Sequence, residues 1–336
     1  MIIVYPSYHV RHRPPNEILN GNRDPHAETP ERIERIKASL GEIEGMQFIL
    51  PRRFPISWIE RVHDHAYVDY LADAGRRAGS EYVYPSVFPY QTDQYTNHEI
   101  GLRGQYSFDM YTPVSSTTYE AARGSAMAAL TAASHIRRGE RVAYALCRPP
   151  GHHAERARMG GYCYFNNCAI AAEYLSTRAR VAILDIDVHH GNGTQDIFYS
   201  RPDVLVVNIH AHPDTRFPYF TGRNIERGEG EGVGYNLNFP LPLATRDVVY
   251  HRALQSALAR IRQFDPVYLV VSVGYDTHKD DSIGGFCLST EYYSRLAGAI
   301  AGLHLPTVLI QEGGYNTEML GTVAQTFTRG FLVAIE

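Results

Sequence analysis

Short runs of apolar, often β-branched residues recur along the chain, and longer helix-like stretches separate most of them. The apolar runs, which we predict to be buried strands, cover residues 2–5, 142–146, 181–184, 204–207, 267–273 and 307–310. The helix-like stretches cover residues 119–138, 168–178, 248–263 and 291–303. Strands that alternate with helices favour an α/β fold, in which helices cover both faces of a parallel sheet.

A further helix is predicted near the N-terminus. Thr29 is a preferred N-cap residue, Pro30 suits the first helical turn, and Ile33, Ile36 and Leu40 share one face. We expect this helix to contribute mainly to core packing.

Residues 81–111 interrupt the alternation because they have no clear period. Eight of these 31 residues are aromatic, against 11% of the whole chain. The charged residues are four acids and one arginine: Glu81, Asp93, Glu99, Asp109 and Arg103. Such a long excursion is typical of a functional or interface loop. We predict a single domain, residues 1–336, that carries this insertion at about residues 81–111.

Composition mainly excludes classes of partner. The chain of 336 residues is 44% hydrophobic and 20% charged, and its formal net charge is -4. No basic run marks a nucleic-acid face, and no apolar stretch approaches the ~20 residues that span a bilayer. The N-terminus lacks a basic leader, and the four cysteines are too few for a disulfide framework. We therefore expect a cytoplasmic protein with neither nucleic acid nor membrane as partner.

Polar side chains follow four of the predicted strands at the point where each strand ends. In parallel sheets, ligands bind outside the carboxyl ends of the strands. The runs that end at residues 146, 184, 273 and 310 are followed by these residues: His152 and His153; Asp185, Asp187 and His189; Asp276; and Tyr315. Four strand ends thus bring His, Asp and Tyr to one rim of the sheet.

The segment after residue 184 favours a metal site. Asp185, Asp187 and His189 alternate along an extended backbone, so their side chains point to one face. Asp276 would complete a site of Asp187, His189 and Asp276 with a fourth position open, and both zinc and ferrous iron suit these ligands. The alternative is that the two aspartates only cap turns, but the coincidence of four strand ends argues against it.

The remaining strand-end residues suit catalysis beside a metal. His152 and His153 follow a tight Pro-Pro-Gly turn, and a nearly neutral imidazole there could take a proton from water. Tyr315 follows two glycines, and its phenol could stabilise an oxyanion. Each signal alone is weak, since His pairs occur in solvated loops and Tyr315 is one of 24 tyrosines.

Four motifs, in chain order, resemble those of histone deacetylases and, most closely, bacterial acetylpolyamine amidohydrolases. They are RPPGHHA at 148–154, GGYCYFNN at 160–167, LDIDVHHGNGTQDIFY at 184–199 and EGGYN at 312–316. The resemblance implies the arginase-like deacetylase fold, with a central parallel sheet of eight strands flanked by helices on both faces. It also implies a zinc-dependent deacetylase.

The resemblance implies roles for individual side chains, with zinc on the three ligands named above. His153 would be the general base, and His152 would be its electrostatic partner or a proton donor. Tyr315 would be the donor that polarises the carbonyl. Two acceptors would orient the histidines: Asp185 and Asn192. The walls of the substrate channel would be Gly161, Tyr162 and, as a weaker match, Phe217.

The family also carries structural monovalent cations, usually potassium. The first site would use Asp185 and backbone oxygens of Asp187, His189 and Ile209, with Asn208 where many relatives have serine. The second would use backbone oxygens near Phe198, Arg201, Val204 and Tyr235. An acetate exit path would pass Arg32, although a surface position is the commoner one for a helical arginine.

In the polyamine enzymes that the chain resembles, an inserted loop narrows the substrate channel, and residues 81–111 fit that loop. Its acidic and aromatic residues would favour a flexible polycation as substrate. We therefore expect acetylputrescine, acetylcadaverine or acetylspermidine as substrate, and a homodimer formed through residues 81–111, as in the polyamine enzymes that the chain resembles. Tyr111 stands where those enzymes lead us to expect glutamate, so a broader deacylase of acetyl-lysine peptides or small amides is the alternative.

Two other classes of protein would account for part of the pattern. A binuclear manganese ureohydrolase would share the fold, but it needs further aspartates in a DxHxD pattern, which the sequence after Asp187 lacks. A binding module without activity would not need all the predicted catalytic and metal-binding residues together.

Overall fold

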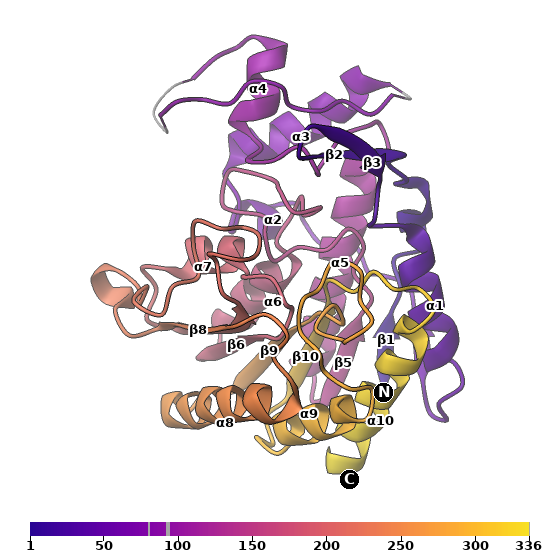
Figure 1. The fold of residues 1–336 in the computed structure, drawn as a ribbon, viewed down its shortest axis with the longest axis vertical. Coiled ribbons are helices and arrows are strands. Elements are labelled where there is room, and N and C mark those ends of the chain that lie inside the picture. Colours follow the sequence, from indigo (N-terminus) through magenta and orange to yellow (C-terminus); the bar gives the residue numbers. More distant parts are fainter. Residues whose placement is uncertain (80, 92–94, 336) are drawn as a thin grey trace.

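The computed structural model describes residues 1–79, 81–91 and 95–335. Its centre is a sheet of eight parallel strands in the order β4-β1-β5-β10-β9-β6-β7-β8 (Figure 1). In that order the strands are Gln47–Ile49, Ile2–Val4, Val142–Ala145, Thr307–Gln311, Tyr268–Val273, Val181–Asp185, Val204–Ala211 and Asn236–Leu241. The predicted α/β fold with a central parallel sheet of eight strands is confirmed.

Helices cover both faces of the sheet. One layer consists of α1 (Pro30–Leu40), α8 (Asp247–Phe264), α9 (Tyr292–Ala301) and α10 (Leu320–Ile335). The other consists of α2 (Ser57–Glu60), α3 (His65–Ala78), α5 (Thr118–Ile136), α6 (Asn167–Ser176) and α7 (Asn192–Phe198). In β6, Ala182 and Leu184 pack toward the first layer, whereas Val181 and Ile183 pack toward the second. Because both faces are buried, the central strands are apolar throughout.

All six predicted strands are present, and so is the N-terminal helix. Its N-cap is Thr29, and Ile33, Ile36 and Leu40 are buried. Within the central sheet, the strands that the apolar pattern did not predict are the two edges, β4 and β8. β4 has only three residues and is largely exposed, while β8 contains asparagines and a proline, so neither forms an apolar run.

The insertion at residues 81–111 lies at the end of the molecule opposite α8 (Figure 1). The described residues of the insertion contain one short helix, α4 (Glu99–Gln105), whose seven residues are too few to show a helical period. Nearby, β2 (Asn16–Leu19) and β3 (Asn22–Pro25) form an antiparallel hairpin. Asp93, one of the four acids of the insertion, lies outside the described residues.

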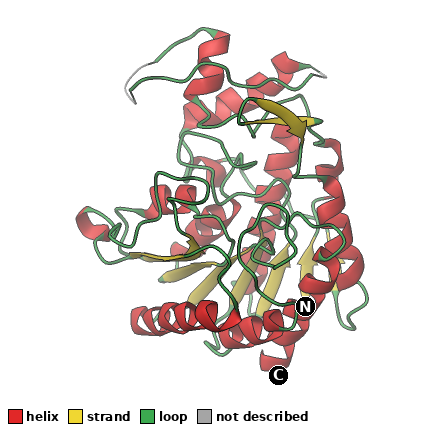
Figure 2. Ribbon diagram, in the orientation of Figure 1, coloured by secondary structure: helices red, strands yellow, loops and turns green. Residues whose placement is uncertain are grey.

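Long loops, rather than regular elements, stand at the carboxyl ends of the strands (Figure 2). These loops hold the strand-end residues that the sequence singled out. Across the described part of the chain, no helix has the length and apolar character needed to cross a bilayer.

Candidate metal centre and active site

Four neighbouring strands position the candidate site. They are β5, β10, β9 and β6, which are contiguous in the sheet. The chain that follows them carries, in the same order, the His152–His153 pair, Tyr315, Asp276 and the Asp187–His189 segment. Since parallel strands all end at one rim, residues from distant parts of the sequence meet there.

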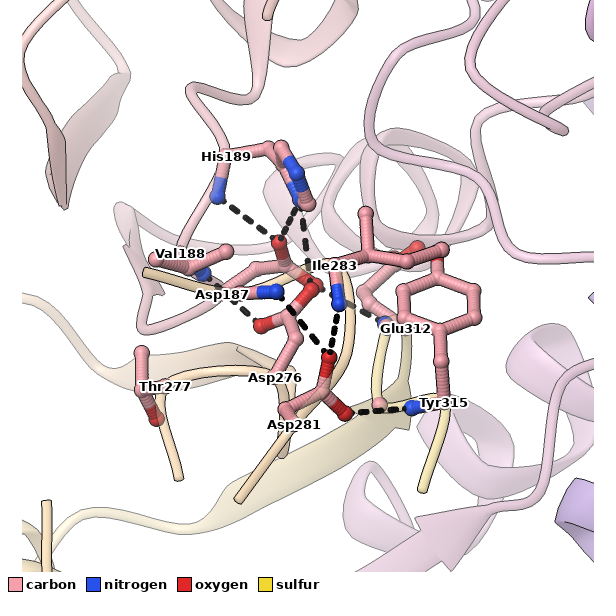
Figure 3. Close-up of polar contacts among 12 residues, drawn as sticks. Asp187, Val188, His189, Asp276, Thr277, Asp281, Ile283, Glu312 and Tyr315 are labelled. Carbon is pink, nitrogen blue, oxygen red and sulfur yellow. Dashed lines mark hydrogen bonds and ion pairs between the residues drawn. The ribbon is translucent and has the colours of Figure 1, made fainter. Parts of the chain in front are cut away.

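The three predicted metal ligands converge in the structure (Figure 3). His189 Nδ1 lies 3.1 Å from Asp187 Oδ1 and 3.2 Å from Asp276 Oδ2. All three side chains are buried, and within the described chain Asp276 Oδ2 has no hydrogen-bond partner. Two carboxylate oxygens and one imidazole nitrogen, within 4.8 Å of one another, fit a single divalent cation.

Backbone amides hold the other carboxylate oxygens in place. Gly313 N donates to Asp187 Oδ2 at 2.8 Å, and Val188 N donates to Asp276 Oδ1 at 2.9 Å. A Cβ atom on Gly313 would lie 2.1 Å from Asp276 Oδ2, so only glycine allows this approach. Burial and the neighbouring charge of Asp187 raise the pKa of Asp276 to about 7. A bound cation would relieve this repulsion between carboxylates.

The two histidines of the predicted catalytic pair have different partners. His152 Nδ1 lies 3.0 Å from Asp185 Oδ2, and His153 Nδ1 lies 2.7 Å from Asn192 Oδ1. Burial favours a neutral His152, but the carboxylates of Asp185 and Asp187 outweigh it and raise the pKa of His152 to about 10. Burial and the charge of His152 hold the pKa of His153 well below its ordinary value. The surroundings therefore favour the charged form of His152 and the neutral form of His153.

The Tyr315 phenol lines a cavity that His153 and His189 also line. Asp281 anchors the backbone of Tyr315 (Figure 3). Asp281 Oδ2 accepts from Tyr315 N at 2.6 Å and from Asn316 N at 3.2 Å. Burial raises the pKa of Tyr315 well above its ordinary value, so the phenol keeps its proton and can donate it.

The predicted channel residues line one cavity of about 320 Å³. It brings together six residues that the sequence predicted: His153, Gly161, Tyr162, His189, Phe217 and Tyr315. The Phe217 ring stands edge-on to His153, with centroids 4.9 Å apart. Phe108 and Tyr111 of the insertion contact Phe217 in turn, at 6.1 and 5.8 Å between ring centroids. The insertion therefore supports one wall of the cavity.

Arg32 is not on the surface, so that expectation was wrong. Its side chain is fully buried and donates to Glu28 Oε1 at 2.6 Å and to the backbone oxygens of Glu312 and Gly314. Its guanidinium carbon lies 4.6 Å from the centroid of the Tyr315 ring. The spacing of four residues between Glu28 and Arg32 was a signal for this pair.

Sequence reasoning also missed several carboxylates around the site. Glu312 Oε2 accepts from the backbone of Gly151 at 2.6 Å and of His152 at 3.1 Å, which fixes the histidine loop. Glu17, on the β2–β3 hairpin, lines the cavity and accepts from the Tyr162 hydroxyl at 2.7 Å. Glu312 stands inside a matched motif, whereas no local pattern distinguishes Glu17.

The residues of the two predicted monovalent cation sites lie in or beside elements that contact one another. Asp185 and Asn208 are paired across β6 and β7, and both are buried. Within the described residues, neither polar atom of the Asn208 side chain has a hydrogen-bond partner. For the second site, the relevant residues lie at the end of α7, the turn after it, the start of β7 and just before β8: Phe198, Arg201, Val204 and Tyr235.

The sequence of the chain is similar to those of known histone deacetylase family proteins. Residues 26–331 match the histone deacetylase domain. Acetylpolyamine amidohydrolase 1 of Pseudomonas aeruginosa is 42% identical over 98% of this chain and 99% of that protein. The acetylpolyamine amidohydrolase of Burkholderia pseudomallei is 40% identical over 95% of each chain.

A solved structure extends this likeness to three dimensions. The crystal structure of acetylpolyamine aminohydrolase from Burkholderia pseudomallei superimposes with a TM-score of 0.96 at 38% identity, and covers 99% of both chains. The HD domain of HDA15 superimposes with a TM-score of 0.83 at 29% identity, over 99% of this chain and 89% of that one. The chain therefore belongs to the histone deacetylase family.

Proposed function

We propose that the chain is a zinc-dependent deacetylase that hydrolyses N-acetylated polyamines to acetate and the free amine. The observation that carries this proposal is the meeting of a three-ligand cation site with a neutral imidazole and a protonated phenol beside one cavity. Metal, base and hydrogen-bond donor are the components with which metal-assisted amide hydrolysis proceeds.

Asp187, His189 and Asp276 would hold the cation. When bound, zinc would polarise the acetyl carbonyl and lower the pKa of a water molecule to about 7. Ferrous iron suits the same ligands. Among the described residues these three form the one group able to hold such an ion, which favours one metal per chain over a binuclear ureohydrolase.

The side chains around the cation divide the remaining work. His153 receives the proton of the attacking water, because burial and the charge of His152 keep it neutral. Tyr315 donates a hydrogen bond to the carbonyl oxygen as negative charge develops there. The charged His152 stabilises that negative charge, and the imidazole pair returns a proton to the departing amine.

The substrate is inferred from the relatives and from the cavity. The relatives from Pseudomonas and Burkholderia are named acetylpolyamine amidohydrolases. In this chain, Glu17 places a carboxylate on the cavity wall, which the aromatic rings of Tyr111 and Tyr162 also line. A distal ammonium group of a polyamine would be attracted by this charge and by the rings.

Two acids of the insertion are already engaged within the chain. Asp109 accepts from the backbone of Gly161 and Tyr111, and Glu99 pairs with Arg103 at 2.5 Å. Of the described acids, Glu17 is the one that lines the cavity, so we assign the acidic contribution to substrate choice to Glu17, while the rings of the insertion support the wall.

A panel of acetylated amines tests the proposal. Zinc-loaded enzyme should hydrolyse acetylputrescine, acetylcadaverine and acetylspermidine faster than an acetyl-lysine peptide, and Asp187→Ala should abolish all four activities. Equal or faster turnover of the peptide would instead favour the broader deacylase. Turnover of none of them would refute the deacetylase assignment.

The proposal includes three further features of the protein. Potassium would bind beside Asp185, where the buried Asn208 amide lacks a partner among the described residues. A homodimer would form through residues 81–111, where Tyr95 is exposed. A reducing cytoplasm suits the free cysteines, three of which are buried. Light scattering, and activity measured with and without potassium, would test the first two features.

A further inference from the structure

Glu155 lies behind the proposed base, in contact with Asn192. Asn192 Oδ1 is 2.7 Å from His153 Nδ1, while Asn192 Nδ2 donates to Glu155 Oε1 at 3.0 Å. The same Nδ2 lies 3.4 Å from the backbone oxygen of His153. Imidazole, amide and carboxylate thus form a continuous chain of hydrogen bonds that starts at the base.

Glu155, at the end of this row of hydrogen bonds, fixes the direction in which each of them is donated. A side-chain amide can be turned over with little change of shape, because its oxygen and nitrogen ends are nearly isosteric. An ionised carboxylate, by contrast, can only accept. Turning the Asn192 amide over would press its oxygen against Glu155 Oε1 and the His153 carbonyl oxygen, which are both acceptors. Glu155 therefore keeps the amide oxygen directed at His153.

This polarity determines which nitrogen of His153 carries the proton. Since the Asn192 oxygen only accepts, the hydrogen must lie on Nδ1, and Nε2 keeps its free lone pair. We propose that Glu155 is a positioning residue that sets the tautomer of His153 through the amide of Asn192. The importance of that tautomer for catalysis rests on the proposed function, whereas the tautomer itself does not.

Arg158 holds Glu155 in the required orientation. Its Nε donates to Glu155 Oε2 at 2.8 Å and its Nη2 lies 2.6 Å from the same oxygen. Burial raises the pKa of Glu155, and the guanidinium of Arg158 opposes this rise. Oε2 is thus committed to Arg158, which leaves Oε1 for Asn192.

Because Arg158 only donates, it would also orient a glutamine introduced at position 155. The glutamine oxygen would face the guanidinium, and its NH2 group would face Asn192. That NH2 would favour the overturned amide of Asn192, which would donate to His153 Nδ1 and move the imidazole proton to Nε2. The more conservative substitution therefore reverses the whole chain of hydrogen bonds.

The first test compares Glu155→Gln with Glu155→Ala. We expect kcat to fall about 100-fold in Glu155→Gln but only about 10-fold in Glu155→Ala, with KM unchanged in both. Alanine leaves room for water from the adjacent cavity of about 710 Å³, which Glu155 and Asn192 line, and water can accept from Asn192 Nδ2. A packing role for Glu155 predicts the opposite order, and that order would overturn the proposal.

The second test exchanges the two functional groups. Glu155→Gln combined with Asn192→Asp keeps the formal charge, and the new carboxylate at position 192 would accept from both His153 and the glutamine. We expect kcat to return to within about tenfold of the wild-type value. Asn192→Asp alone should be poor, because it places two carboxylates about 3 Å apart.

A matched control is available on α5. Glu120 pairs with Arg123 at 3.1 Å with the same i,i+3 spacing, and both side chains are exposed. Glu120→Gln should leave kcat and thermal stability unchanged. Melting temperatures of every variant would identify losses caused by misfolding.

The decisive measurement is the ¹⁵N spectrum of the imidazoles in zinc-loaded protein. Wild-type His153 should have a protonated Nδ1 and a bare Nε2, Glu155→Gln should reverse them, and the double variant should restore them. An unchanged His153 tautomer in Glu155→Gln would overturn the proposal. If wild-type protein hydrolyses no acetylated amine, the proposed function fails, yet these spectra still decide the role of Glu155.

Discussion

The partner of each imidazole, rather than its place in the chain, decides how His152 and His153 behave. His152 faces a carboxylate, whereas His153 faces a neutral amide. Two adjacent residues of one type thereby become a charged group and a neutral base within a single buried site. For Tyr315 the surroundings act in a different way, because desolvation raises the pKa of a phenol that is already protonated at neutral pH.

Removal of the Tyr315 hydroxyl should affect turnover but not metal binding. In Tyr315→Phe we expect kcat to fall by about 10²–10³, the usual cost of losing one donor to a developing oxyanion. Zinc content per chain should remain that of the wild type, because Tyr315 is not among the three ligands. Steady-state kinetics and metal analysis of the same sample check both parts, and wild-type turnover would exclude the donor role.

At the scale of elements, one partly buried carboxylate, Asp281, joins two loops. Asp281 accepts four backbone hydrogen bonds, two from its own loop and two from the loop after β10 (Figure 3). Its own loop includes Ile283, which lines the cavity, and the other loop carries Tyr315. Asp281 thus joins a wall of the cavity to the proposed catalytic phenol.

Substitution of Asp281 should therefore displace Tyr315. We expect Asp281→Ala to lower kcat about 10–100-fold, the range typical of groups that orient catalytic residues. Asp281→Asn should retain part of the activity, since its single acceptor oxygen can serve only one of the two loops. Equal activity of wild type and Asp281→Ala would contradict this role.

A second carboxylate, Glu28, neutralises two buried guanidinium groups. Glu28 Oε1 lies 2.6 Å from Arg32 Nη1 and 2.8 Å from Arg148 Nε. Burial opposes ionisation, but the two arginines lower the pKa of Glu28 below its ordinary value. The ionised form therefore stabilises the fold above the ordinary carboxyl pKa, and this contribution is lost as pH falls through the depressed value.

Removal of the Glu28 charge should be costly. Glu28→Gln should lower the free energy of unfolding by about 3–5 kcal/mol, because it leaves buried arginines without a counter-charge. Glu31→Gln, in the first turn of α1, is the control. Glu31 pairs with Arg13 at the surface, so its loss should be below about 1 kcal/mol. Urea unfolding of both variants measures the difference, and similar losses would argue against a special role for burial.

The elements differ in how far the sequence predicts them. Central strands are buried on both faces, so they stand out as apolar runs, and all six such runs became strands. The edge strands β4 and β8 are partly exposed and carry polar residues, which removes that signal. The helix α4 is shorter than two turns, so hydrophobic periodicity could not reveal it.

The whole molecule brings together residues that no local pattern connects. The metal ligands were predictable because each follows a strand in a parallel sheet, and the ends of such strands share one rim. Glu17 and Glu155 were not, since each acts through a tertiary contact, with Tyr162 and Asn192. Glu312 lies inside a matched motif, but its contact with the His152 backbone is likewise tertiary. The sequence position of a carboxylate carries no mark of the partner that it will meet.

Metal removal should affect the stability of the entire chain. Without a cation, the buried carboxylates of Asp187 and Asp276 repel each other, so zinc binding should raise Tm. Zinc at about 1,000 times its Kd would stabilise the folded state by about 4 kcal/mol. Melting curves before and after chelation check this expectation. The Tm of Asp187→Ala should not change when zinc is added. If the Tm of the wild type does not change either, the proposed zinc site would be contradicted.

The place of β10 in the sheet has a consequence for biosynthesis. β10 is the last strand to be made, yet it separates β5 from β9, so a nascent chain that ends before residue 307 holds two unjoined half-sheets. One half carries the histidine pair and the other carries the cation ligands. Translation must therefore be nearly complete before the histidine pair can meet the cation ligands, and a truncated product would carry those ligands without the pair beside them.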